Sequence, residues 1–212
     1  LASNYSLAAE TVTAKIAPVM VTVSGVTASN KVYDGTLLAS IDRSQATLAG
    51  VITNDDVSLT GTAVGAFADQ NAGTGKVVTV SGLSLAGAAA GNYSLASYAT
   101  SANITRKTVT LTGLTAVDKV YDGSTTAALS GTASLNGLVT GETLVLSGTA
   151  VGTFSDRNAG TNKTVSVSGL ALSDASSGSG LAANYTLASY TSSANITKKS
   201  LNLSGLSASN KV

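Results

Sequence analysis

The sequence predicts an all-β chain that contains two small β domains in tandem, arranged as an elongated rod. Three observations carry this prediction: apolar and polar residues alternate, turn residues recur at intervals of roughly 8–12 residues, and long motifs occur twice. Alternation with a period of two places one face of a strand in a core and the other in water. Regularly spaced short strands are typical of sandwiches and barrels.

The alternation is clearest in the middle of each copy. Val78 and Val80 are separated by Thr79, and the same pattern returns over residues 165–168 and in the run Thr108–Thr112. Threonine on the solvent face also suits a pleated strand. We therefore expect strands at these positions, with valine and leucine forming the core.

Turn residues divide these runs. The predicted turns are Tyr33-Asp34-Gly35, Asn54-Asp55-Asp56, Thr60-Gly61, Asn71-Ala72-Gly73, Ser81-Gly82 and Gly91-Asn92. The best helix candidate is Leu37–Ala49, but the matching segment 128–133 of the second copy carries glycine and alternates. We therefore predict strand or loop there instead of helix.

The motif repeats set the expected domains. Three motifs return in the same order, at 31–35 and 119–123, at 71–74 and 158–161, and at 92–98 and 184–190. A unit of roughly 90 residues exceeds a solenoid rung and suits a small domain with its own core.

We expect four segments: the end of a preceding repeat over 1–17, domains over 18–105 and 106–197, and the start of a following repeat over 198–212. The join over 102–109 contains no glycine, proline or serine-rich linker, which predicts a stiff connection. The terminal segments would carry unpaired strand edges, so pairing between chains stays open.

Composition excludes several classes of function. The chain has no cysteine and no histidine, which removes disulfides, thiolate metal sites and the commonest general base. Charged residues make up 11 % and the net charge is +1, which is too weak for nucleic-acid binding. No apolar run approaches the roughly 20 residues of a membrane span. No acid pair recurs in both copies, so we expect no enzyme activity and no catalytic, cofactor-binding or metal-binding residues.

Two repeated motifs nevertheless resemble parts of binding sites. Tyr33-Asp34-Gly35 and Tyr121-Asp122-Gly123 could form a binding tip, but a strand ending in a turn explains them better. Asp69-x-Asn71-x-Gly73 and Asp156-x-Asn158-x-Gly160 are similar to half a calcium loop. The acid that closes such a loop is missing downstream; Asp55-Asp56 could contribute in one copy, where the other has Gly141-Glu142. We expect plain turns, with calcium as the alternative.

Two modifications also stay open. Lys31 and Lys119 could form an amide cross-link with asparagine, which requires a neutral amine and a buried carboxyl group; an ion-paired lysine is the simpler reading. Asn-x-Ser/Thr acceptor sequences for glycosylation occur at Asn4, Asn92, Asn103, Asn162, Asn184, Asn195 and Asn202.

Four ordered motifs carry a family resemblance. They are Lys-Val-Tyr-Asp-Gly (31–35, 119–123), Phe-x-Asp-x-Asn-Ala-Gly (67–73, 154–160), Asn-Tyr-x-Leu (92–95, 184–187) and Ala-Asn-Ile-Thr-x-Lys at the join. Together they resemble the YDG-type repeat domain of large secreted bacterial adhesins of the filamentous-haemagglutinin-like kind, exported by two-partner secretion.

The resemblance implies an extracellular or cell-surface location and a spacer or stalk repeat that projects a distal binding region. It implies an immunoglobulin-like sandwich, with a β-grasp-like unit as the alternative fold. The expected partners are neighbouring repeats of the same chain and, through other regions, a host or matrix glycan or protein. The alternative function is a module that binds glycan or matrix weakly and many times over.

Overall fold

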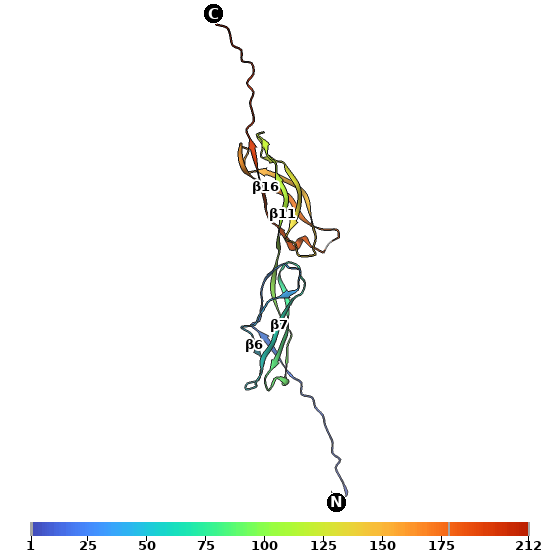
Figure 1. Cartoon of the computed structure of the whole chain (residues 1–212). Coiled ribbons are helices and arrows are strands. Elements are labelled where there is room, and N and C mark those ends of the chain that lie inside the picture. The colour runs from blue at the N-terminus through green and yellow to red at the C-terminus, as the bar shows by residue number, and fades with distance from the viewer. Residues whose placement is uncertain (1, 178, 212) are drawn as a thin grey trace. The chain divides into compact units, whose positions relative to one another are not determined.

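The computed structural model describes residues 2–177 and 179–211. Within these residues the secondary structure is strand, with three short 3-10 turns and no α-helix, so the all-β prediction is confirmed. Two groups of curled sheets follow one another along the chain, as expected for tandem β domains (Figure 1). Whether each is an immunoglobulin-like sandwich stays a prediction.

The elements of the first sequence copy follow a short turn near the N-terminus. They are η1 (Ala2–Asn4), β1 (Val19–Ser24), β2 (Thr27–Ala28), β3 (Lys31–Val32), β4 (Leu38–Ala39), β5 (Ile41–Asp42), β6 (Thr47–Ala49), β7 (Ser58–Phe67), β8 (Gly73–Ala86), η2 (Ala90–Asn92), β9 (Tyr93–Leu95) and β10 (Tyr98–Thr105).

The second copy repeats most of this order. Its elements are β11 (Lys107–Ala116), β12 (Lys119–Val120), β13 (Thr126–Ala127), β14 (Leu129–Asn136), β15 (Leu144–Phe154), β16 (Gly160–Asp174), η3 (Ala182–Asn184), β17 (Tyr185–Leu187) and β18 (Tyr190–Thr197). A single residue, Arg106, separates β10 from β11.

The sheets have the same order in both copies. Each copy has a three-stranded sheet, β6-β1-β9 and β14-β11-β17, and a five-stranded sheet, β3-β10-β8-β7-β4 and β12-β18-β16-β15-β13. A further pair joins β2 and β5. The first strand of each copy pairs in parallel with a late strand, β1 with β9 and β11 with β17. The start and end of each copy therefore lie side by side.

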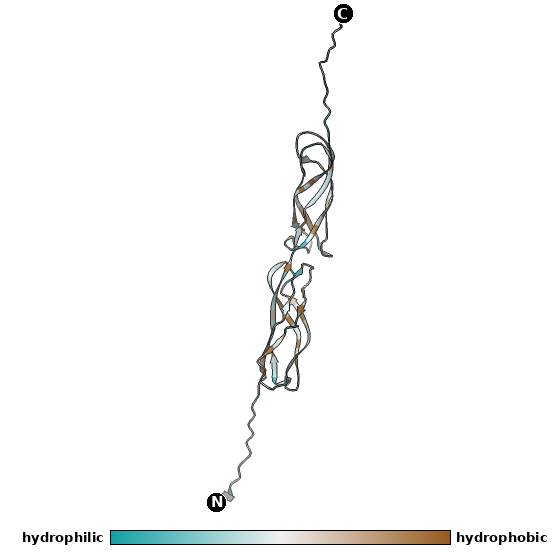
Figure 2. Ribbon diagram, turned by 90° about the vertical axis from the view of Figure 1, so that its left-hand side faces the viewer, coloured by the Kyte–Doolittle hydropathy of each residue, from teal (hydrophilic) through white to brown (hydrophobic). Residues whose placement is uncertain are grey.

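The predicted alternation sets which residues enter the core. Val78 and Val80 in β8 are buried and Thr79 between them is exposed; Val165 in β16 is fully buried. Apolar and polar bands accordingly follow one another along the strands in Figure 2.

Each core draws on both sheets of its copy. One core cluster contains Val23, Val26 and Val80, with Leu48 and Leu59 packed against it. A second cluster, in the second copy, contains Ala127, Phe154, Val165, Ala194 and Ile196 of the five-stranded sheet, with Ala116 of β11 and Leu129 of β14 packed against it. Apart from Phe154 these side chains are aliphatic, and their burial supplies the main driving force for folding, since the chain has few aromatic residues.

Two of the predicted turns are wrong. Thr60-Gly61 and Ser81-Gly82 lie inside β7 and β8, at a β-bulge where the pairing register shifts. Gly61 and Gly82 have φ of +91° and +76°, and a Cβ on Gly61 would lie 2.2 Å from the Gly82 carbonyl oxygen. Glycine is therefore required there by a close approach of two backbones, a use that sequence alone does not separate from a turn.

The segment Leu37–Ala49 forms β4, β5 and β6, so the preference for strand or loop over helix is confirmed. Residues 5–18 and 198–211 are exposed and contain no strand or helix. None of the helical segments in the described part of the chain has the length and apolar character to cross a membrane.

The chain divides into two compact units whose limits depart from the repeat limits. The first unit contains Leu1–Asn30, Leu37–Asp69 and Gly75–Asn103, and the second contains Lys31–Thr36, Gln70–Thr74 and Ile104–Val212. Two turns of the first sequence copy, 31–36 and 70–74, therefore belong to the second compact unit. The expected boundaries, 18–105 and 106–197, stay a prediction.

Candidate functional site

The Lys-Val-Tyr-Asp-Gly motif folds as a turn held by its own side chains. Lys31 Nζ donates to Asp34 Oδ1 at 2.7 Å and to the Thr36 carbonyl oxygen at 2.7 Å, and the Thr36 amide donates to Asp34 Oδ1 at 2.9 Å. Gly35 has φ of +76°. In the first copy the aspartate and the glycine therefore form a turn, as predicted from the sequence.

The second copy builds the same turn. Lys119 Nζ donates to Asp122 Oδ1 at 2.9 Å and to the Ser124 carbonyl oxygen at 2.8 Å, and the Ser124 amide donates to Asp122 Oδ1 at 2.8 Å. The hydrogen bonds from Lys119 and Ser124 hold the pKa of Asp122 well below its usual range.

In the first copy burial acts to raise the pKa of Asp34, but the bonds from Lys31 and Thr36 together outweigh it and lower the pKa. Both lysines are thus paired with carboxylates. This geometry describes charged ammonium groups, whereas an amide cross-link needs a neutral amine.

The two segments that are similar to half a calcium loop, 69–73 and 156–160, also form ion pairs with lysine. Asp69 accepts from Lys76 Nζ at 2.6 Å, and Asp156 accepts from Lys163 Nζ at 2.7 Å. The Asn158 amide donates to Asp156 Oδ1 at 2.8 Å, which is the predicted Asx turn. The described residues contain no group of three acidic side chains that could hold a metal ion. A cation at either loop would have to displace an ammonium group.

The best-defined polar cluster lies inside the second compact unit and centres on Glu142. Tyr33 Oη donates to Glu142 Oε1 at 2.5 Å, and Tyr185 Oη donates to Glu142 Oε2 at 2.6 Å. The two tyrosine rings meet edge to face, with centroids 5.4 Å apart and an interplanar angle of 78°. One carboxylate therefore holds two tyrosine hydroxyls at once.

Both tyrosines are buried. Tyr33 is 1 % exposed and Tyr185 is 3 % exposed. Burial, and then the hydrogen bond to Glu142, raises the pKa of Tyr33 to about 12. The same two causes, in the same order, raise the pKa of Tyr185. The phenols therefore stay protonated and keep donating across the physiological range.

The turn that carries Glu142 is fixed from both sides. The Glu142 amide donates to the Val139 carbonyl oxygen at 3.0 Å, and the Val139 amide donates to Tyr185 Oη at 3.0 Å. A Cβ on Gly35 would lie 3.1 Å from Val139 Cγ1, so the turn of 33–36 fits closely against the turn of 139–142.

A buried asparagine completes the cluster. Asn184 is 1 % exposed and is the one buried polar side chain among the described residues. Its Oδ1 accepts from the Ala72 amide at 2.8 Å, and its Nδ2 donates to Asn71 Oδ1 at 3.0 Å. Both short segments of the first copy, 31–36 and 70–74, are thus tied into the second compact unit by side-chain hydrogen bonds.

The first copy carries part of the same arrangement. Tyr93 Oη donates to Asp55 Oδ2, and the Ile52 amide donates to Tyr93 Oη at 3.1 Å. The bond to Asp55, and then burial, raises the pKa of Tyr93. Asp55 thus occupies the place of Glu142, and Tyr93 that of Tyr185.

The sequence analysis found the tyrosines and missed their partners. From the sequence, Glu142 stands out only as part of the Gly141-Glu142 pair that replaces Asp55-Asp56 in the second copy, and Asn184 only as a glycosylation acceptor. A signal for Glu142 existed, since Asp55 and Glu142 are acids that both follow a short loop before a long strand. No sequence signal identifies Tyr33 and Glu142 as partners.

The glycosylation acceptors differ in their environment. Asn184 is buried, and the side chains of Asn103 and Asn195 accept hydrogen bonds from the Gly75 and Asn162 amides. Exposed acceptor positions are Asn4, Asn92, Asn162 and Asn202. Only these four exposed asparagines leave room for a glycan without rearrangement of the fold.

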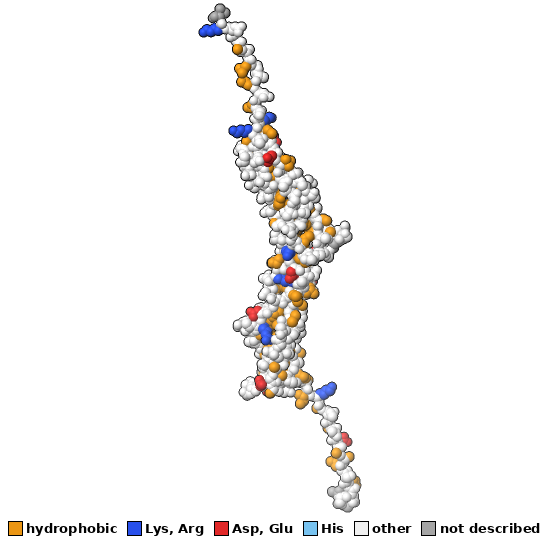
Figure 3. All heavy atoms as spheres, in the orientation of Figure 1, with side chains coloured by type: hydrophobic (Ala, Val, Ile, Leu, Met, Phe, Trp, Pro, Cys, Tyr) orange, Lys and Arg blue, Asp and Glu red, His pale blue; other side chains and the backbone are white. Residues whose placement is uncertain are grey.

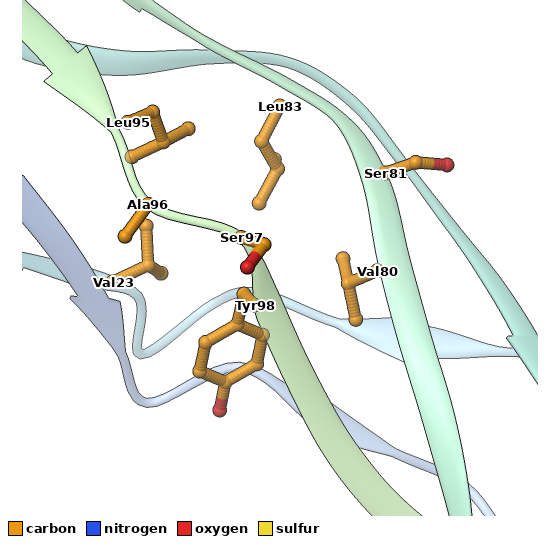
Figure 4. A pocket seen from close by; sticks show the side chains of 8 residues that line it. All are labelled: Val23, Val80, Ser81, Leu83, Leu95, Ala96, Ser97 and Tyr98. Atoms are coloured by element: carbon orange, nitrogen blue, oxygen red, sulfur yellow. The ribbon is translucent and has the colours of Figure 1, made fainter.

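The hollow beside the first core is lined mainly by apolar side chains and offers few groups that could recognise a ligand. A hollow of about 180 Å³ is lined by Val23, Val80, Leu83, Leu95 and Tyr98, with Ser81, Ala96 and Ser97 beside them (Figure 4). Tyr98 Oη is used inside the fold, since it donates to the Val26 carbonyl oxygen at 2.7 Å. We interpret this hollow as a gap at the core edge.

The surface carries few charges. Charged side chains are scattered over the face seen in Figure 3 and form no continuous patch there.

Comparison with known proteins identifies one family. The family model described as the YDG domain matches twice, over residues 17–102 and 105–194. Neither the curated proteins nor the solved structures gave a match.

Proposed function

Because the chain belongs to the YDG domain family, we propose that its two domains are spacer repeats in the stalk of a large secreted or cell-surface bacterial adhesin, where they hold a distal binding region away from the cell. They act outside the cell, on this proposal, and have no catalytic role. Their partners are neighbouring repeats of the same chain.

The connection of the copies carries this proposal. Strand β10 ends at Thr105 and β11 begins at Lys107, which leaves one residue and no flexible linker. In addition, the segments 31–36 and 70–74 of the first copy are built into the second compact unit. A chain that extends without linkers resists bending, which is the property that a stalk requires.

Small-angle X-ray scattering on chains with two, four and six copies tests the proposal. The maximum dimension should grow in proportion to copy number. A matched chain with a glycine–serine linker inserted at Arg106 should grow closer to the square root of its length. Growth of the native series no faster than that of the linker series contradicts the spacer role.

One observation favours the alternative, a weak glycan- or matrix-binding module. Tyr121 is 37 % exposed and lines a hollow of about 430 Å³ together with Asn158, Lys198 and Lys199. Aromatic and amide groups of this kind suit sugar rings. A glycan array on the chain and on Tyr121→Ala tests it: specific signal that the substitution abolishes would support binding.

A further inference from the structure

The Glu142 cluster has two incomplete counterparts elsewhere in the chain. One is a surface with an acid and a tyrosine, which we call the acceptor surface: Ile52, Asp55, Asn92 and Tyr93. By position in the repeat, these match Val139, Glu142, Asn184 and Tyr185. The other is a surface with a tyrosine turn, which we call the donor surface: Tyr121, Asn158 and Ala159. These match Tyr33, Asn71 and Ala72.

The donor surface is uncovered. Tyr121 is 37 % exposed, whereas Tyr33 is 1 % exposed, although Lys119 and Asp122 hold its turn as Lys31 and Asp34 hold the other. Asn158 and Ala159 are also exposed, while Asn71 and Ala72 are partly buried. The same turn therefore exists in two states that differ in whether a partner covers it.

The acceptor surface is uncovered too. Ile52 is 57 % exposed and Asn92 is exposed, whereas its counterpart Asn184 is 1 % exposed. A hollow of about 330 Å³ opens there, lined by Ile52, Asp55, Asn92 and Tyr93 with the neighbouring residues 16–19 and 91. In the described part of the chain, Asp55 receives one tyrosine hydroxyl where Glu142 receives two.

The chemistry of the two surfaces is complementary. The acceptor surface offers a carboxylate that already orders one phenol, and an exposed amide side chain. The donor surface offers a phenol and the backbone amide of an Asn-Ala turn. These are the groups joined by Tyr33 with Glu142 and by Ala72 with Asn184 inside the second unit. Asp55 is one methylene shorter than Glu142, so the incoming turn has to approach more closely.

We propose that the acceptor surface of Ile52, Asp55, Asn92 and Tyr93 docks the tyrosine turn and the Asn-Ala turn of another YDG domain, joined to its N-terminal side. This inference rests on the proposed function and names the partner that a stalk repeat engages. The acid of each domain accepts one phenol from its own chain segment and one from the preceding domain. Each domain thereby buries the tyrosine of the domain before it.

An extended chain tests the docking. Residues 1–197 are followed directly by residues 18–212, so that Thr197 meets Pro18 as Thr105 meets Arg106 in the native join. The Tyr121 turn of the upstream half then precedes the Asp55 surface of the downstream half. The downstream Tyr121 has no domain after it and serves as the matched control inside the same molecule.

Tyrosine-to-phenylalanine substitutions give the readout. We expect upstream Tyr121→Phe to lower the denaturant midpoint by a shift comparable with that of Tyr33→Phe in the 212-residue chain. Downstream Tyr121→Phe should leave the midpoint unchanged. Upstream Tyr121→Phe and downstream Asp55→Asn should be non-additive, because they remove two ends of one hydrogen bond. Equal effects of the two Tyr121 substitutions, or full additivity, overturn the proposal.

Cross-linking covers the case in which a variant fails to fold. p-Benzoylphenylalanine at upstream position 121 should cross-link on illumination to peptides that contain residues 52–55 or 92–93. The same group at Tyr5, which is 86 % exposed, is the control and should not. Cross-links elsewhere, or a glycan-array signal that requires Tyr121 without thermodynamic coupling to Asp55, assign the donor surface to another ligand and overturn the docking.

The spacer role can fail separately. Scattering on the same extended chain measures its maximum dimension, and coupling energies measure docking. A small maximum dimension together with strong coupling contradicts the spacer role and supports the docking. A large maximum dimension without coupling supports the spacer role and contradicts the docking.

Discussion

Tyr33 and Glu142 are joined by a 2.5 Å hydrogen bond although 109 positions separate them in the sequence. The tyrosine belongs to the first copy of the repeat and the glutamate to the second, yet both lie in one compact unit. In the first copy, the tyrosine of the Tyr-Asp-Gly motif therefore bonds to a residue outside the sequence repeat that contains it.

Removal of the Tyr33 hydroxyl should destabilise the second unit. Tyr33→Phe leaves Glu142 Oε1 without its phenol donor, and we expect a loss of about 1.5–3 kcal/mol in the free energy of unfolding. Tyr121→Phe is the matched control and should stay within about 0.5 kcal/mol, because that side chain is exposed. Urea denaturation followed by circular dichroism measures both. Equal losses in the two variants would contradict the assigned role of Glu142.

Stability should fall at alkaline pH because of the same phenol. The pKa of Tyr33 rises from 10.0 in the unfolded chain to about 12 in the folded one. The folded state then binds more protons between these values, so this contribution is complete below pH 10 and is lost as the pH rises towards 12. Urea midpoints of the parent and Tyr33→Phe should converge over this window. Subtracting the variant removes the pH-dependent contributions that the two proteins share.

Replacement of Gly35 by alanine has two costs, backbone strain and a close contact with Val139, and these can be measured separately. Gly35 and Gly123 have φ of +76° and +82°, so alanine costs about 1–2 kcal/mol at each through strain alone. Only at Gly35 would the new Cβ also press on Val139 Cγ1 at 3.1 Å; at Gly123 nothing lies within 4 Å. We therefore expect Gly35→Ala to cost about 1 kcal/mol more than Gly123→Ala. Thermal melts of the two variants make the comparison, and a larger cost at Gly123 would count against the fit.

The buried asparagine gives an independent check on the cluster. Asn184→Ala leaves the Ala72 amide without its acceptor, and we expect a loss of about 1–3 kcal/mol. Asn92→Ala, at the matching exposed position, should change stability by less than about 0.5 kcal/mol. Hydrogen exchange of the Ala72 amide should accelerate in Asn184→Ala and remain slow in Asn92→Ala. Unchanged protection in Asn184→Ala would show that this bond does not hold the 70–74 turn.

The ion pairs in the tyrosine turns should matter less at acid pH. The pKa of Asp122 is lowered mainly by its bond from Lys119, so its contribution is complete above the usual carboxylate pKa and is lost as the pH falls below it. Asp122→Asn should therefore shift the urea midpoint at pH 7 and have a smaller effect at pH 3. An effect of the same size at both values would mean that charge is not what the aspartate supplies.

The fold class could be predicted from the sequence because it depends on local patterns. The alternation around Val78 and Val80 predicts the strand and its buried face, and comparison of 37–49 with its second copy favours strand or loop over helix. The sequence predicts turns at Thr60-Gly61 and Ser81-Gly82 because glycine with a positive φ is as typical of a turn as of a β-bulge. Gly61 is recognised as part of a bulge only from the shift in strand register and from the close approach of the Gly82 carbonyl oxygen.

The cluster itself could not be predicted in the same way. A strand that ends in a turn gives no reason to bury Tyr33, yet the structure buries the whole side chain. Its burial depends on Glu142 and Tyr185, which are distant in sequence, and no local rule brings them together. The lack of cysteine and histidine narrows the class of function, but only the coordinates pair Tyr33 with Glu142.

The placement of 31–36 and 70–74 bears on how these proteins are cut for study. A fragment excised at the limits of the second family match, 105–194, would retain Glu142 and Asn184 but lack the Tyr33 hydroxyl and the Ala72 amide that bond to them. In such a fragment water would reach Glu142 and Asn184, so measurements on it would not describe the native cluster. Expression designs that keep the upstream turns should yield the more faithful specimen.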